Sequence, residues 1–250
     1  MLRSILWDVD GTLAETERDG HLKAFNQAFE SLHLPWRWSE QHYGELLTVV
    51  GGRERLLHDM QYRDQAPHRP EERQALAEQV HQLKNTLYAD IVSRGDLPLR
   101  DGVRCLMDDC VQTGMRMGIV TTTSRTNVEA LMHTHLGRDW ESGFATVVCA
   151  REAPKKKPDP QAYLLALEAL RLHPREAVAI EDAPAGIAAA QAIGLSVIVT
   201  RSHYFPAAQS RGSLADGPSL GRIEGWRPSA QASATRVSLD QILLWHAHSQ

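Results

Sequence analysis

Short apolar runs alternate with helical patterns through the second half of this chain. The runs, rich in β-branched residues, span 116–121, 145–150, 177–181 and 195–200. The helix-like stretches between them span 126–136, 159–171 and 184–193. Strands that alternate with helices favour a parallel sheet with right-handed crossovers. A further apolar run at 4–7 leads into Asp8, so the predicted sheet includes the N-terminus.

Residues 14–94 have a different pattern, in which apolar side chains recur at helical spacing. These side chains are Leu22, Phe25, Phe29 and Leu32, and farther on Leu76, Val80, Leu83, Leu87 and Ile91. No strand pattern interrupts them, and the Gly- and Pro-containing segment 93–102 is typical of a linker. We therefore predict an α/β fold. Residues 1–13 and 95–250 form a Rossmann-like core with a parallel sheet, and residues 14–94 form an inserted all-helical cap domain.

The C-terminal segment carries weaker signals. Residues 205–235 are rich in Ser, Gly, Ala and Pro, which indicates loops and short irregular structure. Residues 237–246 predict an apolar helix with Ser238 as its N-cap. We expect this helix to pack on the sheet and to have a structural role only.

Composition and charge exclude some classes of function. The chain has 250 residues and a formal net charge of −4, without the basic excess of a general nucleic-acid-binding protein. The N-terminus has no apolar signal core, and no stretch approaches the roughly 20 apolar residues that cross a bilayer. We therefore expect a cytoplasmic protein with no nucleic-acid or membrane partner. A chain of this size can work as a monomer.

The cysteines are few and odd in number, which fits a reduced compartment without a disulfide framework. They are Cys105, Cys110 and Cys149. Cys105 and Cys110 flank the amphipathic segment CLMDDC, where a metal site would lack a second pair of ligands. We interpret both as buried thiols.

The strongest chemical signal is ILWDVDGTL (5–13). An apolar strand ends at Asp8, and the alternation of side chains along a strand places Asp8 and Asp10 on a common side. Two carboxylates this close repel one another and need a cation or a shared proton. Mg²⁺ prefers hard oxygen ligands and would stabilise the pair. Gly11 then allows the chain to turn tightly away. A plain strand-end turn capped by Asp is the alternative.

Three further segments place polar side chains at predicted strand ends or helix starts. IVTTTS (119–124) puts hydroxyls at a strand end, where sheet proteins bind ligands. PKKKPDP (154–160) has a lysine directly before a proline, and AIEDAPAG (179–186) ends a strand with Glu181 and Asp182. Taken alone, each has an ordinary explanation: a Ser/Thr turn, a solvated lysine run, or N-capping acids.

In this order the four segments resemble the motifs of the haloacid-dehalogenase superfamily across essentially the whole core. The resemblance implies an Mg²⁺-dependent phosphatase in which Asp8 attacks phosphorus and forms an aspartyl phosphate. It implies that Asp10 donates a proton to the leaving oxygen and then activates water. Dehalogenases of the superfamily generally lack an acid at the position of Asp10, so dehalogenation is not expected.

The same resemblance assigns the other catalytic and metal-binding residues. Mg²⁺ would be held by Asp8, the backbone carbonyl of Asp10 and Asp182, with Glu181 as a further ligand or as a partner of the ligands. Thr122 would donate a hydrogen bond to the transferring phosphoryl oxygens. Lys157 would neutralise the nucleophile and the phosphate, while Lys156 lies one residue off the Lys-Pro pattern.

The cap sequence resembles one group within this superfamily, the CbbY group. The similar segments are LAETERDGH (13–21), AFN (24–26), YGELLTVVGGRER (43–55) and TTTSRTNVEAL (121–131). Members of that group hydrolyse xylulose 1,5-bisphosphate, a misfire product that inhibits Rubisco in the Calvin cycle. The resemblance therefore implies a small phosphorylated sugar as substrate, and a cap that closes over the site and excludes water.

A bisphosphate needs a second anion site away from Asp8. Arg53 and Arg55, beside the flexible pair Gly51 and Gly52, are candidates, because a guanidinium grips phosphate with a planar fork. Without the resemblance, a decorated helix start is the better explanation for the two arginines. The remaining candidate substrate-binding residues are Glu17, His21 and Tyr43 for sugar hydroxyls, Lys84 for added charge from the cap, and Thr123. A core or surface histidine remains the alternative for His21.

Competing functions stay open at this point. A sugar phosphomutase of the β-phosphoglucomutase type shares both catalytic acids and the helical cap, and sequence motifs do not separate it cleanly. A phosphoglycolate phosphatase would not need an Arg-bearing cap loop. A catalytically idle binding module is disfavoured by the intact Asp8, Asp10, Lys157 and Asp182. The chain has no G-x-S-x-G, H-E-x-x-H, P-loop or G-x-G-x-x-G signature of other chemistries.

Overall fold

A six-stranded parallel sheet forms the centre of the molecule, in the order β3-β2-β1-β4-β5-β6. The computed structural model describes residues 1–207, 211–230 and 234–248. The strands are β1 (Ser4–Trp7), β2 (Arg116–Val120), β3 (Thr146–Val148), β4 (Ala177–Glu181), β5 (Ser196–Thr200) and β6 (Ala215–Gly217). The five strands predicted from apolar runs are confirmed, and all neighbours pair in parallel.

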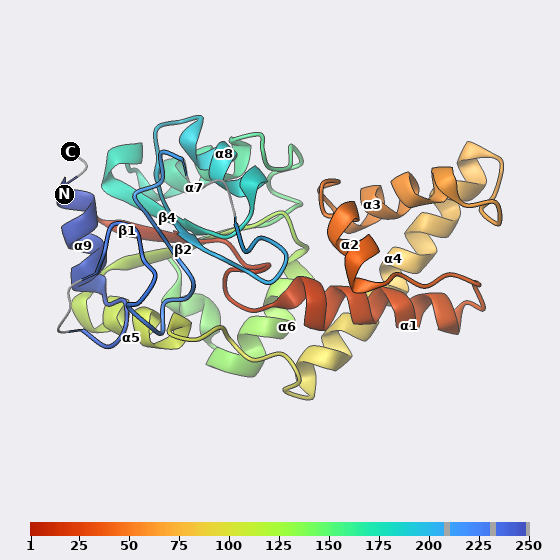
Figure 1. Ribbon diagram of the computed structural model, residues 1–250, viewed down its shortest axis with the longest axis horizontal. Coiled ribbons are helices and arrows are strands. Elements are labelled where there is room, and N and C mark those ends of the chain that lie inside the picture. Colours follow the sequence, from red (N-terminus) through yellow and green to blue (C-terminus); the bar gives the residue numbers. More distant parts are fainter. Residues whose placement is uncertain (208–210, 231–233, 249–250) are drawn as a thin grey trace.

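Helices cover both faces of the sheet (Figure 1). They are α5 (Val103–Thr113), α6 (Arg125–Leu136), α7 (Gln161–Leu170), α8 (Pro184–Gln191) and α9 (Leu239–His248), with the 3₁₀ turns η3 (Trp140–Gly143) and η4 (Pro174–Glu176). Because side chains alternate along a strand, Ile5 and Trp7 of β1 join a buried cluster with α5, α6 and α9. Leu6 joins the opposite cluster with α7 and α8. Burial on both faces explains the continuous apolar runs that predicted the strands.

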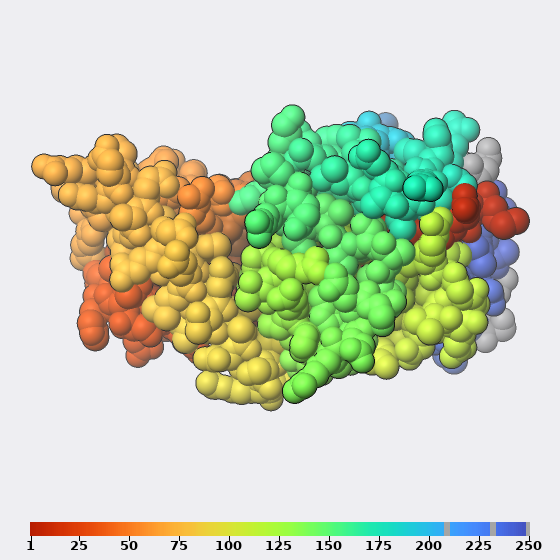
Figure 2. All heavy atoms as spheres, turned by 180° about the vertical axis from the view of Figure 1, so that it is seen from behind, coloured from red at the N-terminus to blue at the C-terminus, as the bar shows by residue number. Residues whose placement is uncertain are grey.

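A helical cap stands apart from the sheet and has a core of its own (Figure 1). Its elements are η1 (Glu17–Leu22), α1 (Lys23–Ser31), α2 (Glu40–Leu46), α3 (Gly52–Asp59), η2 (Met60–Tyr62) and α4 (Pro70–Ser93). Phe25, Phe29 and Trp38 pack together within it, with ring centroids 4.7 and 5.1 Å apart for the two pairs that include Trp38. The long helix α4 extends from the cap to lie beside α6 of the core (Figure 2).

Two chain segments join the cap to the core, and they pair with each other. Ala14 and Leu99 form an isolated antiparallel bridge, and the Arg100 N–H donates to the Leu13 carbonyl at 2.7 Å. The Arg100 guanidinium also donates to the Gly11 carbonyl at 2.5 Å and to the Pro218 carbonyl at 3.1 Å. These bonds tie the crossing point to the loop after Asp8 and hold the cap above the carboxyl ends of the strands.

Two predictions about the periphery are wrong and two are confirmed. Residues 205–235 are not all irregular, because Ala215–Gly217 add the edge strand β6. Cys105 is exposed rather than buried, whereas Cys110 is buried as predicted. The Ser238 hydroxyl accepts a hydrogen bond from the Gln241 N–H at 3.4 Å, as expected of an N-cap. Within the described ranges, the helices are all too short or too polar to cross a bilayer.

Candidate active site

The site is built at the carboxyl end of β1. Asp8 follows the last residue of this strand, and its N–H donates to the Ile180 carbonyl of β4 at 3.1 Å. The chain then turns through Gly11, whose φ of +80° is in the left-handed region. A Cβ on Gly11 would lie 2.1 Å from Asp182 Oδ2. Glycine is therefore required at this position both by the backbone angle and by the close approach of the carboxylate.

Three buried carboxylates meet where β1 and β4 end. Asp8, Glu181 and Asp182 each offer an oxygen, and these oxygens all lie within 4.8 Å of one another. Lys157 Nζ donates to Asp8 Oδ1 at 2.7 Å and to Glu181 Oε1 at 2.6 Å. The Tyr163 hydroxyl donates to the same Glu181 oxygen at 2.5 Å. Glu181 is thus fixed by two donors, and Lys157 is fixed beside Asp8.

This cluster has more negative than positive charge. Burial raises the pKa of Asp8 to about 8, and the neighbouring Glu181 adds to the rise against the opposing effect of Lys157. Burial, followed by the charge of Asp8, also raises the pKa of Asp182 well above its usual value. One lysine does not neutralise three carboxylates. Clustered carboxylate oxygens with a deficit of positive charge are the donor set that suits Mg²⁺.

Asp10 lies apart from this trio and has its own partners. Its Oδ1 accepts hydrogen bonds from the Thr16 hydroxyl at 2.6 Å and from His21 Nε2 at 3.1 Å. Burial alone would raise its pKa, but His21 and Thr16 outweigh burial and lower the pKa to about 2. The Asp10 side chain is outside the three-carboxylate group.

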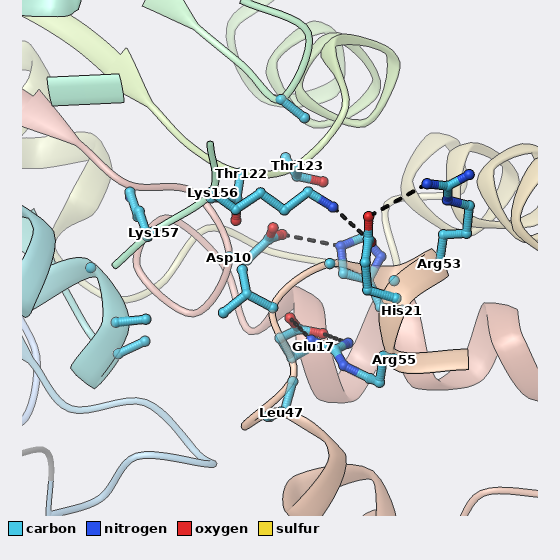
Figure 3. Close-up of a pocket in the computed structure, with 18 of the residues that line it drawn as sticks. Asp10, Glu17, His21, Leu47, Arg53, Arg55, Thr122, Thr123, Lys156 and Lys157 are labelled. Atoms are coloured by element: carbon cyan, nitrogen blue, oxygen red, sulfur yellow. Dashed lines mark hydrogen bonds and ion pairs between the residues drawn. The ribbon is translucent and has the colours of Figure 1, made fainter. Parts of the chain in front are cut away.

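A cavity of about 650 Å³ lies between the core and the cap (Figure 3). The predicted residues that line it are Asp8, Asp10, Glu17, His21, Gly51, Gly52, Arg53, Arg55, Lys84, Thr122, Thr123, Lys157 and Glu181. Tyr43 and Asp182 are outside the lining, each packed behind residues that form it. The Thr123 hydroxyl accepts from Asn127 Nδ2 at 3.1 Å, which fixes the turn between β2 and α6.

The cap side of the cavity contains a buried polar network. The Tyr43 hydroxyl donates to Glu17 Oε2 at 2.5 Å and accepts from Arg55 Nη1 at 2.6 Å. The Arg55 guanidinium lies over the Tyr43 ring, 4.9 Å from its centroid. Arg53, in contrast, has a side chain that is 45% exposed. The two arginines that the sequence pattern treats alike therefore differ: Arg55 is held in place within the network, and Arg53 lies exposed at the cavity.

Sequence reasoning missed several residues of the site. His81, Glu54 and Asn127 line the cavity, and Tyr163 lies behind it on Glu181. Tyr163 carries no chemical signal in the sequence, because it looks like one more apolar residue of α7. His81 stands one turn before Lys84 on α4, so helical spacing alone could have placed both on one face.

Comparison with known proteins agrees with this geometry. Residues 2–194 match the family model of haloacid dehalogenase-like hydrolases. The chain is 39% identical over 247 residues to protein CbbY of Cupriavidus necator, covering 98% of this chain and 97% of that protein. It is 38% identical over 203 residues to protein CbbY of Rhodobacter capsulatus, covering 81% of this chain and 87% of that protein.

Solved structures give the same result. CbbY from Rhodobacter sphaeroides in complex with phosphate superposes with a TM-score of 0.83 at 32% identity, covering 96% of this chain and 99% of that chain. An Asp-to-Asn mutant of that protein, in complex with xylulose 1,5-bisphosphate, gives a TM-score of 0.83 at 31% identity with the same coverage. A β-phosphoglucomutase from Clostridium difficile, at 17% identity and a TM-score of 0.73, shares the fold. This chain therefore belongs to the haloacid dehalogenase-like hydrolases, within their CbbY group, and is a phosphatase.

Proposed function

We propose that this phosphatase depends on Mg²⁺ and hydrolyses xylulose 1,5-bisphosphate to xylulose 5-phosphate and phosphate. One observation carries the proposal: a single cavity has Asp8, Lys157 and Asp10 at its core end and cationic residues at its cap end. Such a cavity suits a sugar with a phosphate at each end. The related protein from Rhodobacter sphaeroides, crystallised with this bisphosphate, supports the choice of substrate.

Asp8 is the proposed nucleophile. One of its oxygens attacks phosphorus, the bond from phosphorus to the sugar oxygen breaks, and an aspartyl phosphate forms. Lys157, 2.7 Å from Asp8, fixes the orientation of the carboxylate and offsets its charge as the phosphate arrives. Thr122 and Thr123 follow β2 and line the cavity, and they would donate hydrogen bonds to the phosphoryl oxygens.

Asp10 is the proposed general acid and base. In its protonated form Asp10 gives its proton to the departing sugar oxygen, so the negative charge of the bound phosphate must raise its pKa from the value of about 2 in the empty site. The resulting carboxylate then removes a proton from the water that hydrolyses the aspartyl phosphate. Its hydrogen bonds with Thr16 and His21 hold the carboxylate at the core end of the cavity, close to Asp8. His21 Nε2 faces Asp10 and can donate to it, and the imidazole is buried while Asp10 is half-buried.

Asp8, Asp182 and the backbone carbonyl of Asp10 would hold Mg²⁺, with Glu181 as a further ligand or as a partner of the ligands. Bound there, the ion supplies positive charge between the attacking carboxylate and the phosphate, which otherwise repel one another. Lys157 and Tyr163 already occupy one oxygen of Glu181. This favours the second role for Glu181, that of a partner which keeps Lys157 in place.

The cap residues are proposed to read the sugar and the distal phosphate. Glu17 and His21 face the cavity and suit sugar hydroxyls, while Tyr43 acts from behind by fixing Glu17 and Arg55. Arg53, Arg55 and Lys84 provide positive charge for the second phosphate. Gly51 and Gly52 let the backbone before α3 approach the ligand closely.

The proposal is tested by phosphate release from a panel of substrates with and without Mg²⁺. We expect kcat/KM for xylulose 1,5-bisphosphate to exceed the values for ribulose 1,5-bisphosphate, β-glucose 1-phosphate and phosphoglycolate by about 100-fold. β-Glucose 1-phosphate and phosphoglycolate lack the second phosphate and its charge-assisted contacts. Ribulose 1,5-bisphosphate has both phosphates and differs only at the C3 hydroxyl, so contacts with the sugar hydroxyls must provide the ratio in that case. Removal of Mg²⁺ by EDTA should abolish every activity. Equal kcat/KM values would remove the assigned substrate, and formation of glucose 6-phosphate would identify a mutase instead.

Lys84 predicts an alkaline limit to bisphosphate turnover. Its ammonium group is buried, and burial lowers its pKa to about 8 against the opposing charges of Asp10 and Glu17. Lys84 is therefore charged below about pH 8 and neutral above it. If the charge binds the distal phosphate, kcat/KM for the bisphosphate should fall about tenfold per pH unit on the alkaline side.

The control for Lys84 is its replacement by a residue that stays charged. Arginine keeps its proton throughout this range, so Lys84→Arg should move the alkaline limb to higher pH. With p-nitrophenyl phosphate, which has no second phosphate, the wild-type limb near pH 8 should be missing. The same limb in the wild type and in Lys84→Arg would show that another group is responsible.

A further inference from the structure

Three consecutive lysines precede the cis peptide at Pro158, and each has different surroundings. Lys155 is exposed, and Lys157 binds Asp8 inside the site. Lys156 instead crosses to the cap, where its Nζ lies 2.7 Å from Glu54 Oε2. Figure 3 shows the Lys156 side chain extending from the core toward the side of the cavity where Arg53 lies. An ion pair thus joins two parts of the fold that have no chain connection at this point.

Gly51 leaves space for this ion pair. A Cβ on Gly51 would lie 2.2 Å from Lys156 Nζ and 2.3 Å from Glu54 Oε2. The residue also has a φ of +100°, which favours glycine. The backbone before α3 is therefore shaped so that the lysine head can reach the glutamate directly above it.

Both partners are coupled in sequence to residues of the proposed mechanism. Lys156 directly precedes Lys157 in the chain, and the Lys157 ammonium group donates hydrogen bonds to Asp8 and Glu181. Glu54 directly precedes Arg55 in the chain, and the Arg55 guanidinium donates hydrogen bonds to Glu17 and Tyr43 in the cap network. When the pair forms, the loop with the catalytic lysine and the start of α3 are therefore held at a fixed separation across the cavity.

The pair is also partly screened from water. The Lys156 and Glu54 side chains are 25% and 39% exposed. The ammonium group of Lys156 lowers the pKa of Glu54 against the effect of burial. Away from this pair the core contacts the cap through Tyr204, which packs against Tyr43 at 5.8 Å between ring centroids, and through His203, whose Nε2 lies 3.6 Å from Glu40 Oε2. Of these core–cap contacts, the Glu54–Lys156 pair is the one whose two residues both line the cavity.

We propose that the Glu54–Lys156 ion pair is a positioning contact that holds the cap closed over the reacting phosphate. Neither residue needs to touch the reacting atoms. Loss of the pair lets α3 move away from the Lys157 loop, which lowers the population of the closed state in which Asp8, Asp10 and the cap residues surround one substrate. If the ligand binds only to closed molecules, its apparent affinity equals the affinity of the closed state multiplied by the fraction of molecules that are closed.

The test is a charge reversal, measured by activity and by distance. Glu54→Lys and Lys156→Glu should each lower kcat/KM by about tenfold or more. The double variant, which restores an attractive pair with reversed signs, should recover to within about threefold of the wild type. Each protein is first checked by thermal unfolding. Glu54→Gln and Lys156→Met serve in place of any reversed variant that does not fold.

Cap closure is measured independently of substrate with spin labels on Cys105 and on a cysteine replacing Tyr62. Cys105 is exposed on α5 of the core, and Tyr62 in the cap is 75% exposed. We expect one narrow distance distribution in the wild type, a shift to longer distances in each single variant, and recovery in the double variant. Because this distance does not depend on which sugar is hydrolysed, it can fail or succeed separately from the proposed function.

The matched control is the Arg3–Glu176 pair, at 2.9 Å and with side chains 54% and 30% exposed. That pair lies outside the cavity lining, so reversing its charges should change neither kcat/KM nor the label distance. Unchanged distances in Glu54→Lys and Lys156→Glu would overturn the proposal. It would also be overturned if Lys156→Met lost activity while Glu54→Gln kept it, because Lys156 would then act on the substrate directly.

Discussion

Replacement of Asp8 by asparagine is expected to abolish phosphate release and to leave the fold intact. The amide has the shape of the carboxylate, and its oxygen can still accept the hydrogen bond that Lys157 now donates to Asp8 at 2.7 Å. It lacks the negative charge and nucleophilicity needed to form the acyl phosphate. Loss of a nucleophile typically removes most of the rate enhancement, so kcat should fall by about 10⁴-fold or more.

Stability separates this effect from unfolding. Asp8 is one of three buried carboxylates with oxygens within 4.8 Å of one another. Burial and Glu181 raise the pKa of Asp8 to about 8, so near neutral pH folding must protonate this carboxylate at a cost in free energy that asparagine avoids. In EDTA near pH 7 the Asp8→Asn variant should therefore unfold at a higher temperature than the wild type. Mg²⁺ should raise the unfolding temperature of the wild type more than that of the variant, because a bound ion stabilises the folded state in proportion to its affinity.

Asp240→Asn, on the exposed face of α9, is the control for both measurements. It should retain wild-type activity and the wild-type response to Mg²⁺. A turnover number for Asp8→Asn within tenfold of the wild type would disprove the assignment of the nucleophile. A variant that is inactive and also unfolded at room temperature would contradict the expected stability instead.

The catalytic end of the site was predictable because it lies where strands end. The apolar run 4–7 identified β1, and the position directly after that run singled out Asp8. The same reasoning located Thr122 after β2 and Glu181 at the end of β4. Carboxyl ends of parallel strands meet at one edge of a sheet, so a one-dimensional pattern was enough to bring these residues together.

The cap end was much less predictable, because its contacts join elements by tertiary packing. Arg53 and Arg55 are two positions apart on α3, and on a helix the side chains of residues i and i+2 point to different faces. Only the packing of α3 against η1 and α2 decides that Arg55 is buried with Glu17 and Tyr43. The Glu54–Lys156 pair could not be predicted for the same reason, since its partners are far apart in the chain.

The missed edge strand has a different cause. Residues 215–217 read Ala-Asp-Gly, with neither β-branched residues nor an alternating pattern. They pair with β5 because Leu214 donates its N–H to Val197 and the following residues continue the ladder. Strands this short are formed by the neighbour they add to, and local propensity contributes little.

Replacement of Asp10 by asparagine is expected to affect substrates according to their leaving groups. A sugar alkoxide is a poor leaving group and needs a proton, so loss of the acid should lower kcat/KM for the sugar phosphate by about 10²- to 10⁴-fold. The p-nitrophenolate ion leaves without a proton, so kcat/KM for p-nitrophenyl phosphate should fall by less than about tenfold.

Hydrolysis of the aspartyl phosphate supplies the second part of the Asp10 prediction. This step is common to both substrates and needs the base, so in Asp10→Asn it should become rate-limiting for p-nitrophenyl phosphate. Rapid mixing should then show a burst of p-nitrophenolate equal to the enzyme concentration, followed by slow turnover.

Thr16→Val is the control, because it removes the 2.6 Å hydrogen bond to Asp10 and keeps the carboxylate. It should lower both rates modestly and show no burst. Equal losses of kcat/KM for the two substrates in Asp10→Asn would mean that Asp10 acts on the phosphoryl group or the fold, because only proton donation distinguishes the leaving groups.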